Sequence, residues 1–172
     1  MSMQTLEDLL EEQLKDLYNA ENQLLKALKK MAKKATNEKL VEAFESHTEE
    51  TQGQIERLEQ IGKKLGYKKM TGKVCKAMQG LVEEGKEVLE EDGSDAVIDA
   101  ALIAAAQRCE HYEISAYGSA RAMAEELGEA QVAKLLQQTL DEESETDEKL
   151  SELSVSEILG AAHAAGSEEE EE

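Results

Sequence analysis

Four glutamates in this chain recur at matched positions of an internal repeat. Glu21 and Glu113 are separated by 92 positions (113 − 21), as are Glu50 and Glu142 (142 − 50). Each lies at mid-height on a largely apolar helical seam without Lys or Arg, where converging carboxylates repel one another unless protons or cations neutralise them. Two divalent metals would supply four positive charges, and carboxylates with some imidazole suit iron or manganese. The sequence therefore predicts a buried two-metal site.

Neighbouring side chains could complete this site. Glu110 lies one helical turn before Glu113 and is either a further ligand or a surface charge. His47 lies one turn before Glu50 and is either a terminal ligand or a hydrogen-bond partner above the metals. Tyr117, one turn after Glu113, is either a phenol beside the site or a packing residue. Any single glutamate could instead lie on a solvated helix shoulder, but four matched positions favour the site.

The helices that would position these residues share one repeating pattern. Residues spaced in alternating steps of four and three line one side of a helix in a bundle. The expected seams are Leu10, Leu14, Leu17, Glu21, Leu24, Leu28 and Met31; Ala43, His47, Glu50, Gln54, Leu58, Ile61 and Leu65; Leu102, Ala106, Cys109, Glu113, Ala116, Ala120 and Met123; and Leu135, Thr139, Glu142, Thr146, Leu150 and Leu153. Each seam brings one glutamate to mid-height.

Start and stop signals place the helix ends. Thr5 with Asp8 is a capping signal, and Gly66 and Gly128 are stop signals. The expected long helices are 5–34, 38–65, 95–127 and 129–153, with a shorter amphipathic helix at 72–91. Two pseudo-symmetric hairpins joined by this crossover predict an all-α, ferritin-like four-helix bundle. Residues 1–156 form this domain, and the acidic tail, 157–172, is expected to be frayed and disordered.

The composition supports a helical protein and narrows its partners. The 172 residues include no Pro and only 3% aromatic residues. A net charge of -20 argues against binding nucleic acid or an anionic membrane. Cys75 and Cys109 form no metal-binding spacing and are expected to be reduced core residues. With neither a signal-peptide pattern nor an apolar run of membrane-spanning length, a cytoplasmic location is expected.

Four segments also carry a family resemblance: residues 17–21 (LYNAE), 46–57 (SHTEETQGQIER), 101–118 (ALIAAAQRCEHYEISAYG) and 139–143 (TLDEE). In these the chain resembles the bacterial YciE/YciF family, and the likeness extends to about Leu153. The resemblance implies a ferritin-like relative of rubrerythrin that is stress-induced, cytoplasmic and dimeric. It implies that the metal ligands are Glu21, Glu50, Glu110, Glu113 and Glu142.

The chain departs from the wider superfamily at two places. Members usually have His one turn after the second-helix and fourth-helix glutamates, where this chain has Gly53 or Gln54 and Glu145 or Thr146. A rubrerythrin also has a second iron centre on four cysteines, which two isolated cysteines cannot form. Any electron donor must therefore be external.

Two main functional hypotheses follow. The first is a di-iron protein, with manganese as the alternative metal, that reduces peroxide or oxygen or oxidises ferrous ion. The second is a non-enzymatic stress protein that acts through its dimer or a partner surface, with a vestigial or metal-free polar core. Iron storage ranks third because nothing in the chain indicates the contacts of a closed cage. The resemblance and the off-seam apolar residues Leu6, Leu25 and Val41 predict a homodimer.

Overall fold

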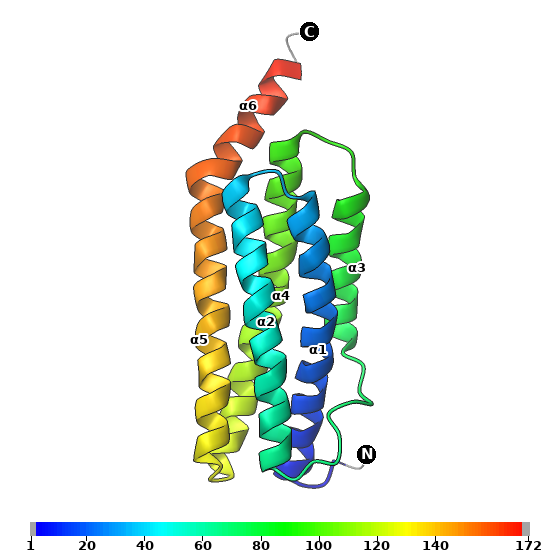
Figure 1. Cartoon of the computed structure of the whole chain (residues 1–172), viewed down its shortest axis with the longest axis vertical. Coiled ribbons are helices and arrows are strands. Elements are labelled where there is room, and N and C mark those ends of the chain that lie inside the picture. The colour runs from blue at the N-terminus through cyan, green and yellow to red at the C-terminus, as the bar shows by residue number, and fades with distance from the viewer. Residues whose placement is uncertain (1–2, 170–172) are drawn as a thin grey trace.

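The computed structural model is a bundle of four long helices (Figure 1). It describes residues 3–169. Helices α1 (Leu6–Lys34) and α2 (Glu38–Lys64) form one hairpin, and α4 (Asp95–Glu126) and α5 (Ala130–Leu153) form the other. A shorter helix, α3 (Lys76–Glu90), connects the hairpins and lies against α1 and α4. The predicted all-α bundle of two hairpins and a crossover helix is confirmed. Within the described part of the chain, no helix is long and apolar enough to span a membrane.

Local signals set the start of α1 and the ends of α2 and α4 where the sequence predicted them. Thr5 and Asp8 cap α1 reciprocally: the Asp8 N–H donates to Thr5 Oγ1 at 3.1 Å, and the Thr5 N–H donates to Asp8 Oδ2 at 3.1 Å. Helices α2 and α4 stop just before Gly66 and Gly128, both of which have φ of 75°. Glycine adopts this left-handed conformation without the steric cost that a side chain would add, so the chain can reverse there.

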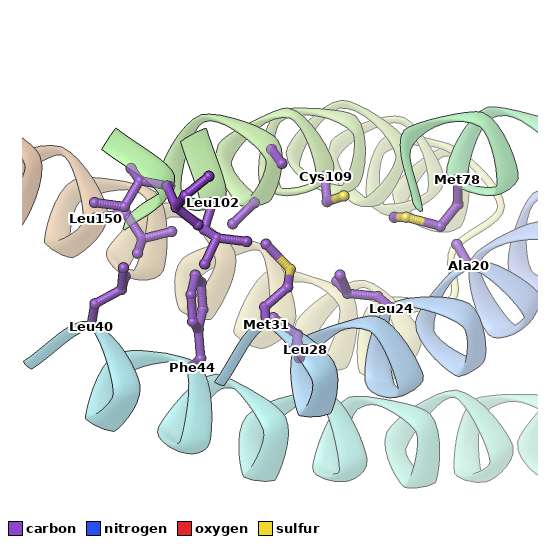
Figure 2. Packing of buried hydrophobic residues seen from close by; sticks show 14 of the residues in the cluster. Ala20, Leu24, Leu28, Met31, Leu40, Phe44, Met78, Leu102, Cys109 and Leu150 are labelled. Atoms are coloured by element: carbon purple, nitrogen blue, oxygen red, sulfur yellow. The ribbon is translucent and has the colours of Figure 1, made fainter. Parts of the chain in front are cut away.

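Apolar side chains fill the bundle in two clusters, with a polar layer between them. The first cluster, shown in Figure 2, includes Leu24, Phe44, Leu102 and Leu150. The second includes Leu17, Leu58, Tyr117 and Leu136. Every long helix passes from one cluster to the other through buried polar residues, among them Glu21, His47, Glu113 and Glu143. The site therefore lies in the middle of the bundle, closed above and below by apolar layers.

Asp99 of α4 fixes the turn between α1 and α2. Its buried carboxylate accepts hydrogen bonds from the Thr36 N–H at 3.0 Å, the Thr36 hydroxyl at 2.8 Å and the Asn37 N–H at 2.8 Å. Hydrogen bonds to an ionised carboxylate are among the stronger ones in proteins. Asp99 thus joins the two hairpins at one end of the bundle.

Two segments differ from the sequence predictions. Helix α3 begins at Lys76 rather than near Gly72, whose φ of 111° keeps it in the preceding loop. After α5 a π-helical turn (Ser154–Ile158) leads into α6 (Leu159–Glu169), whereas the sequence predicted fraying from residue 157 on. The turn is anchored because the side chain of Ile158 is buried in the first apolar cluster. Residues 170–172, the end of the acidic tail, lie outside the described residues.

Candidate metal centre

Helices α1 and α4 place three glutamates in the polar layer. All seven predicted seam residues of α1 are buried, and Glu21 is one of them. On α4, Glu110 and Glu113 lie one turn apart, and both are fully buried. The burial of Glu110 excludes the surface-charge role considered for it, and its role as a ligand stays a prediction.

Helix α2 brings His47 to the same layer. The imidazole is buried, and its Nδ1 lies 3.4 Å from Glu110 Oε1. Burial lowers the pKa of His47, which favours the neutral imidazole. A neutral imidazole is the form that binds metals.

Helix α5 contributes Glu143, not the predicted Glu142. Its buried residues include Val132, Leu136, Thr139, Glu143, Thr146 and Leu150. After Thr139 the next buried residue is therefore Glu143, four positions on, whereas the predicted seam continued three positions on at Glu142. In α2 the inward step from His47 likewise reaches Thr51 rather than Glu50. Both errors have one cause, because an alternating pattern can continue with either step from a polar position.

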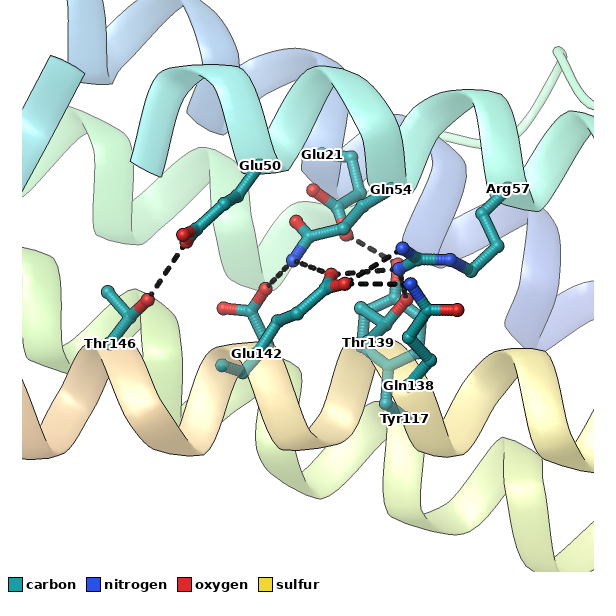
Figure 3. A network of polar contacts seen from close by, with 10 residues as sticks. Glu21, Glu50, Gln54, Arg57, Tyr117, Gln138, Thr139, Glu142 and Thr146 are labelled. Atoms are coloured by element: carbon teal, nitrogen blue, oxygen red, sulfur yellow. Dashed lines mark hydrogen bonds and ion pairs between the residues drawn. The ribbon is translucent and has the colours of Figure 1, made fainter. Parts of the chain in front are cut away.

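The predicted ligands Glu142 and Glu50 lie at the edge of the site. Glu142 is partly exposed and accepts two hydrogen bonds of 2.8 Å from the Arg57 guanidinium of α2 (Figure 3). Partial burial alone would raise the pKa of Glu142, but Arg57 lowers it overall. Glu50 is also partly exposed and accepts a 3.3 Å hydrogen bond from the Thr146 hydroxyl. The structure therefore places neither carboxylate in the buried cluster.

The buried side chains form two groups that share Glu143. His47, Glu110 and Glu143 can each offer one ligand atom, and these atoms lie within 4.8 Å of one another. Glu21, Glu113 and Glu143 do the same. Each group could hold one cation, and the two groups share the Glu143 side chain.

Many polar atoms of the cluster have no hydrogen bond. Within residues 3–169, neither carboxylate oxygen of Glu110 or of Glu113 has a hydrogen-bond partner. In the same range, one oxygen of Glu21, one oxygen of Glu143 and Nε2 of His47 also lack one. Buried polar atoms are normally paired, because each unpaired one costs about 1–3 kcal/mol and more if charged. Most of the buried unpaired side-chain atoms of the described residues belong to the two groups that share Glu143, and the others are on Thr51, Gln54 and Arg121.

Burial and mutual repulsion both weaken the acids of this cluster. Burial first, and then the charge of Glu143, raises the pKa of Glu21 and of Glu110 well above its usual range. Burial, followed by the charge of Glu21, does the same for Glu113. Protons or cations would relieve this repulsion.

Two neighbours already contact the carboxylates. The Tyr117 hydroxyl, fully buried, donates a hydrogen bond to Glu21, so Tyr117 is both a packing residue and a phenol beside the site. Gln54 donates through Nε2 to Glu143 and, at 3.2 Å, to Glu142. Sequence reasoning missed Glu143. The repeat gave no signal for it, because the offset of 92 pairs Glu142 with a glutamate, Glu50, but pairs Glu143 with Thr51 (143 − 51).

Comparison with known proteins places the chain among its relatives. Residues 5–163 match the family described as a domain of unknown function, DUF892. The protein YciF of Escherichia coli K12 is 49% identical over 158 residues, which cover 92% of this chain and 95% of YciF. The chain belongs to the YciF family. The resemblance that the motifs predicted is therefore confirmed.

Solved structures of this family share the fold. The crystal structure of the E. coli stress protein YciF has a TM-score of 0.86 and 50% identity, and the match covers 89% of this chain and 96% of that one. YcfI of Rhodopseudomonas palustris, described as a candidate structural protein, has a TM-score of 0.84 and 48% identity over 87% and 95% of the two chains. A Xanthomonas campestris protein with 22% identity and a TM-score of 0.73, over 98% and 100% of the two chains, shares the fold.

Proposed function

We propose that this chain is a stress-response protein that binds two divalent metals, iron or manganese, between its four long helices. The observation that carries the proposal is the set of unpaired atoms on Glu21, Glu110, Glu113 and Glu143. Buried carboxylates are costly in a folded protein when some or all of their oxygens lack a partner. Two divalent ions would neutralise four carboxylate charges, and the unpaired oxygens would serve as their ligands.

The residues present fit such a pair of ions. Carboxylate oxygens with one neutral imidazole are suitable donors for ferrous or manganous ions. Glu143 would bridge the ions, His47 and Glu110 would hold one, and Glu21 and Glu113 would hold the other. The two positions differ chemically, because only the first includes a nitrogen donor.

The chemistry proposed for the pair is redox. Two ferrous ions held together would supply two electrons, the number needed to cleave the oxygen–oxygen bond of a peroxide or to begin the reduction of oxygen. The surrounding residues exclude water, since apolar layers close the site above and below. The Tyr117 hydroxyl, beside the site, donates its proton in a hydrogen bond to Glu21. We propose that an external donor restores the electrons and that the reaction takes place in the cytoplasm.

Anaerobic ferrous loading tests this function. Metal-free protein is incubated with ferrous ion, desalted and analysed for iron, and we expect close to two iron atoms per chain. Anaerobic hydrogen peroxide is then added in substoichiometric steps, and we expect about two ferrous ions to be oxidised per peroxide. Protein that retains no iron or manganese would overturn the metal site. Metal that binds but resists both peroxide and oxygen would overturn the redox function alone.

A second candidate is a stress protein with a metal-free core. The observation that favours it is Gln54, which lies where the superfamily usually has His and already donates a hydrogen bond to Glu143. Thr146 lies at the equivalent position of α5. An internal partner for the bridging carboxylate would weaken metal binding. The iron analysis above separates the two candidates.

We also propose that the protein is a homodimer, as its family resemblance implies. Leu6, Leu25 and Val41, the apolar residues expected off the seam, are half-buried in the isolated chain. Burying the remaining apolar area of these residues would favour association. Light scattering at micromolar concentration should give twice the 19.0 kDa mass of one chain. A single species of 19.0 kDa would count against the dimer.

A further inference from the structure

An apolar cavity of about 250 Å³ lies between α1, α3 and α4, beside the metal centre. Its inner wall includes the buried side chains of Leu24, Met31, Ala105 and Cys109. Figure 2 shows Leu24, Met31 and Cys109 on facing helices at this level of the bundle. The cavity therefore reaches from the crossover helix to the residue that precedes Glu110.

Small residues on the facing helices leave this space open. A Cβ added to Gly85 of α3 would meet the Ala105 side chain of α4 at 3.8 Å, an ordinary contact distance. Ala27 of α1 is a third small residue in the lining. Larger side chains at these positions would close the gap between the crossover helix and the bundle.

The rim of the cavity is basic, although the chain as a whole is strongly acidic. Lys26, Lys30 and Lys86 line it and are exposed, whereas none of its lining residues is Asp or Glu. Lys86 forms an ion pair with Glu90 at 3.3 Å. In the described part of the chain, neither Lys26 nor Lys30 has an acidic group within ion-pair distance. The chain has 39 acidic and 19 basic residues, so a rim whose charged residues are all lysines has the opposite sign of charge to the chain as a whole.

We infer that this cavity binds a small anionic amphiphile, a free carboxylate with a hydrocarbon tail of medium length. The lysines would hold the carboxylate, and the tail would lie on the apolar wall toward Cys109. Ligand sites are usually apolar cavities with a few well-placed polar groups that orient the ligand. The site uses none of the proposed metal ligands, so its test does not depend on metal binding.

Calorimetry with sodium octanoate on the metal-free full-length chain tests the inference. We expect saturable binding of one octanoate per chain, with weaker binding of 1-octanol because the alcohol lacks the charge. From butanoate to octanoate, affinity should rise about fourfold for each added methylene, the factor expected for burial of one such group.

Two variant pairs locate the site. Gly85→Leu should fill the cavity and weaken octanoate binding at least tenfold, whereas Gly80→Leu on the same helix, where an added Cβ meets nothing within 4 Å, should leave it unchanged. The double change Lys26→Gln, Lys30→Gln should weaken octanoate at least fivefold and spare octanol. The same change at Lys29 and Lys33, which do not line the cavity, is the control for net charge.

Three results would overturn the inference. One is the absence of saturable binding at millimolar octanoate. Another is equal affinity for octanol and octanoate, which would remove the role of the lysines. The last is binding that Gly85→Leu and the Lys26, Lys30 double change leave unaltered, which would place the ligand elsewhere. The exposed lysine variants keep the test valid even if Gly85→Leu does not fold.

Discussion

Thr51 and Glu143 occupy equivalent positions of the two helical hairpins, and both are fully buried at the level of the candidate metal centre. The repeat therefore brings a hydroxyl inward from one hairpin and a carboxylate inward from the other. Only α5 supplies the carboxylate that both groups of ligands share. This asymmetry makes Glu143 the residue on which the two proposed metal positions depend.

The adjacent pair Glu143 and Glu142 gives the sharpest test of the ligand set. Glu143→Gln should lower ferrous affinity at both positions by at least the roughly 10-fold to 100-fold that loss of an outer partner of a metal ligand costs, since each position would lose its shared ligand. Glu142→Gln, one residue away, is the matched control and should retain close to two iron atoms, because Glu142 is paired with Arg57 outside the cluster. Equilibrium dialysis measures both variants. A larger loss in Glu142→Gln than in Glu143→Gln would contradict the assignment.

Much of this arrangement could be predicted from the sequence. The part that could not depends on packing between helices. The α1 seam and the cap at Thr5 were predicted correctly, because local chemistry determines them. Glu142 and Glu143 are neighbouring carboxylates, and the sequence favours Glu142 only because the offset of 92 pairs it with Glu50. Their directions differ by about 100° around the helix, and only packing against the other helices decides which one points inward.

Removing one buried carboxylate should stabilise the metal-free protein. Glu113→Gln keeps the shape of the side chain but removes a carboxyl group that at pH 7 must either repel the charges of Glu21 and Glu143 or hold a proton that it would release in the unfolded chain. We expect its free energy of unfolding at pH 7 to exceed that of the wild type by about 1–3 kcal/mol. Ferrous ion should reverse the order, because a ligand at 100 times its dissociation constant stabilises the native state by about 2.7 kcal/mol. Urea unfolding measures both states. A less stable metal-free variant would show that the carboxylates are structural.

The destabilising effect of the buried carboxylates should also appear in the pH dependence of stability. Because burial raises the pKa of Glu110, the folded protein keeps a proton that the unfolded chain releases as the pH rises above the usual pKa of 4.5. The free energy of unfolding of the metal-free wild type should therefore fall as the pH rises from 4.5 toward the raised pKa of Glu110, by about 1.4 kcal/mol for each pH unit.

Glu110→Gln isolates this effect from the other titrating groups. His47, with its lowered pKa, acts in the opposite direction below about 6.5 in both proteins. The stability advantage of Glu110→Gln over the wild type should be absent near pH 4 and should grow between pH 5 and pH 8. Thermal melts across this range measure it. A constant difference at all pH values would contradict the raised pKa.

Asp99 should be important for stability without affecting the metals. Asp99→Ala would leave the Thr36 and Asn37 donors of the α1–α2 turn without their acceptor. We expect a loss of about 2–4 kcal/mol in urea unfolding, with no change in metal stoichiometry. Asp95→Ala, an exposed position in the first turn of the same helix, is the control and should cost less than about 1 kcal/mol. Equal losses in the two variants would contradict this role.

Anomalous X-ray diffraction from crystals grown anaerobically with ferrous ion tests the central claim most directly. Data collected on both sides of the iron absorption edge locate iron atoms without assumptions about ligands. We predict two peaks in the middle of the bundle, one bounded by His47 and Glu110 and the other by Glu21 and Glu113, with Glu143 between them. A bundle centre without iron, or iron only at the partly exposed Glu50 and Glu142, would contradict the account.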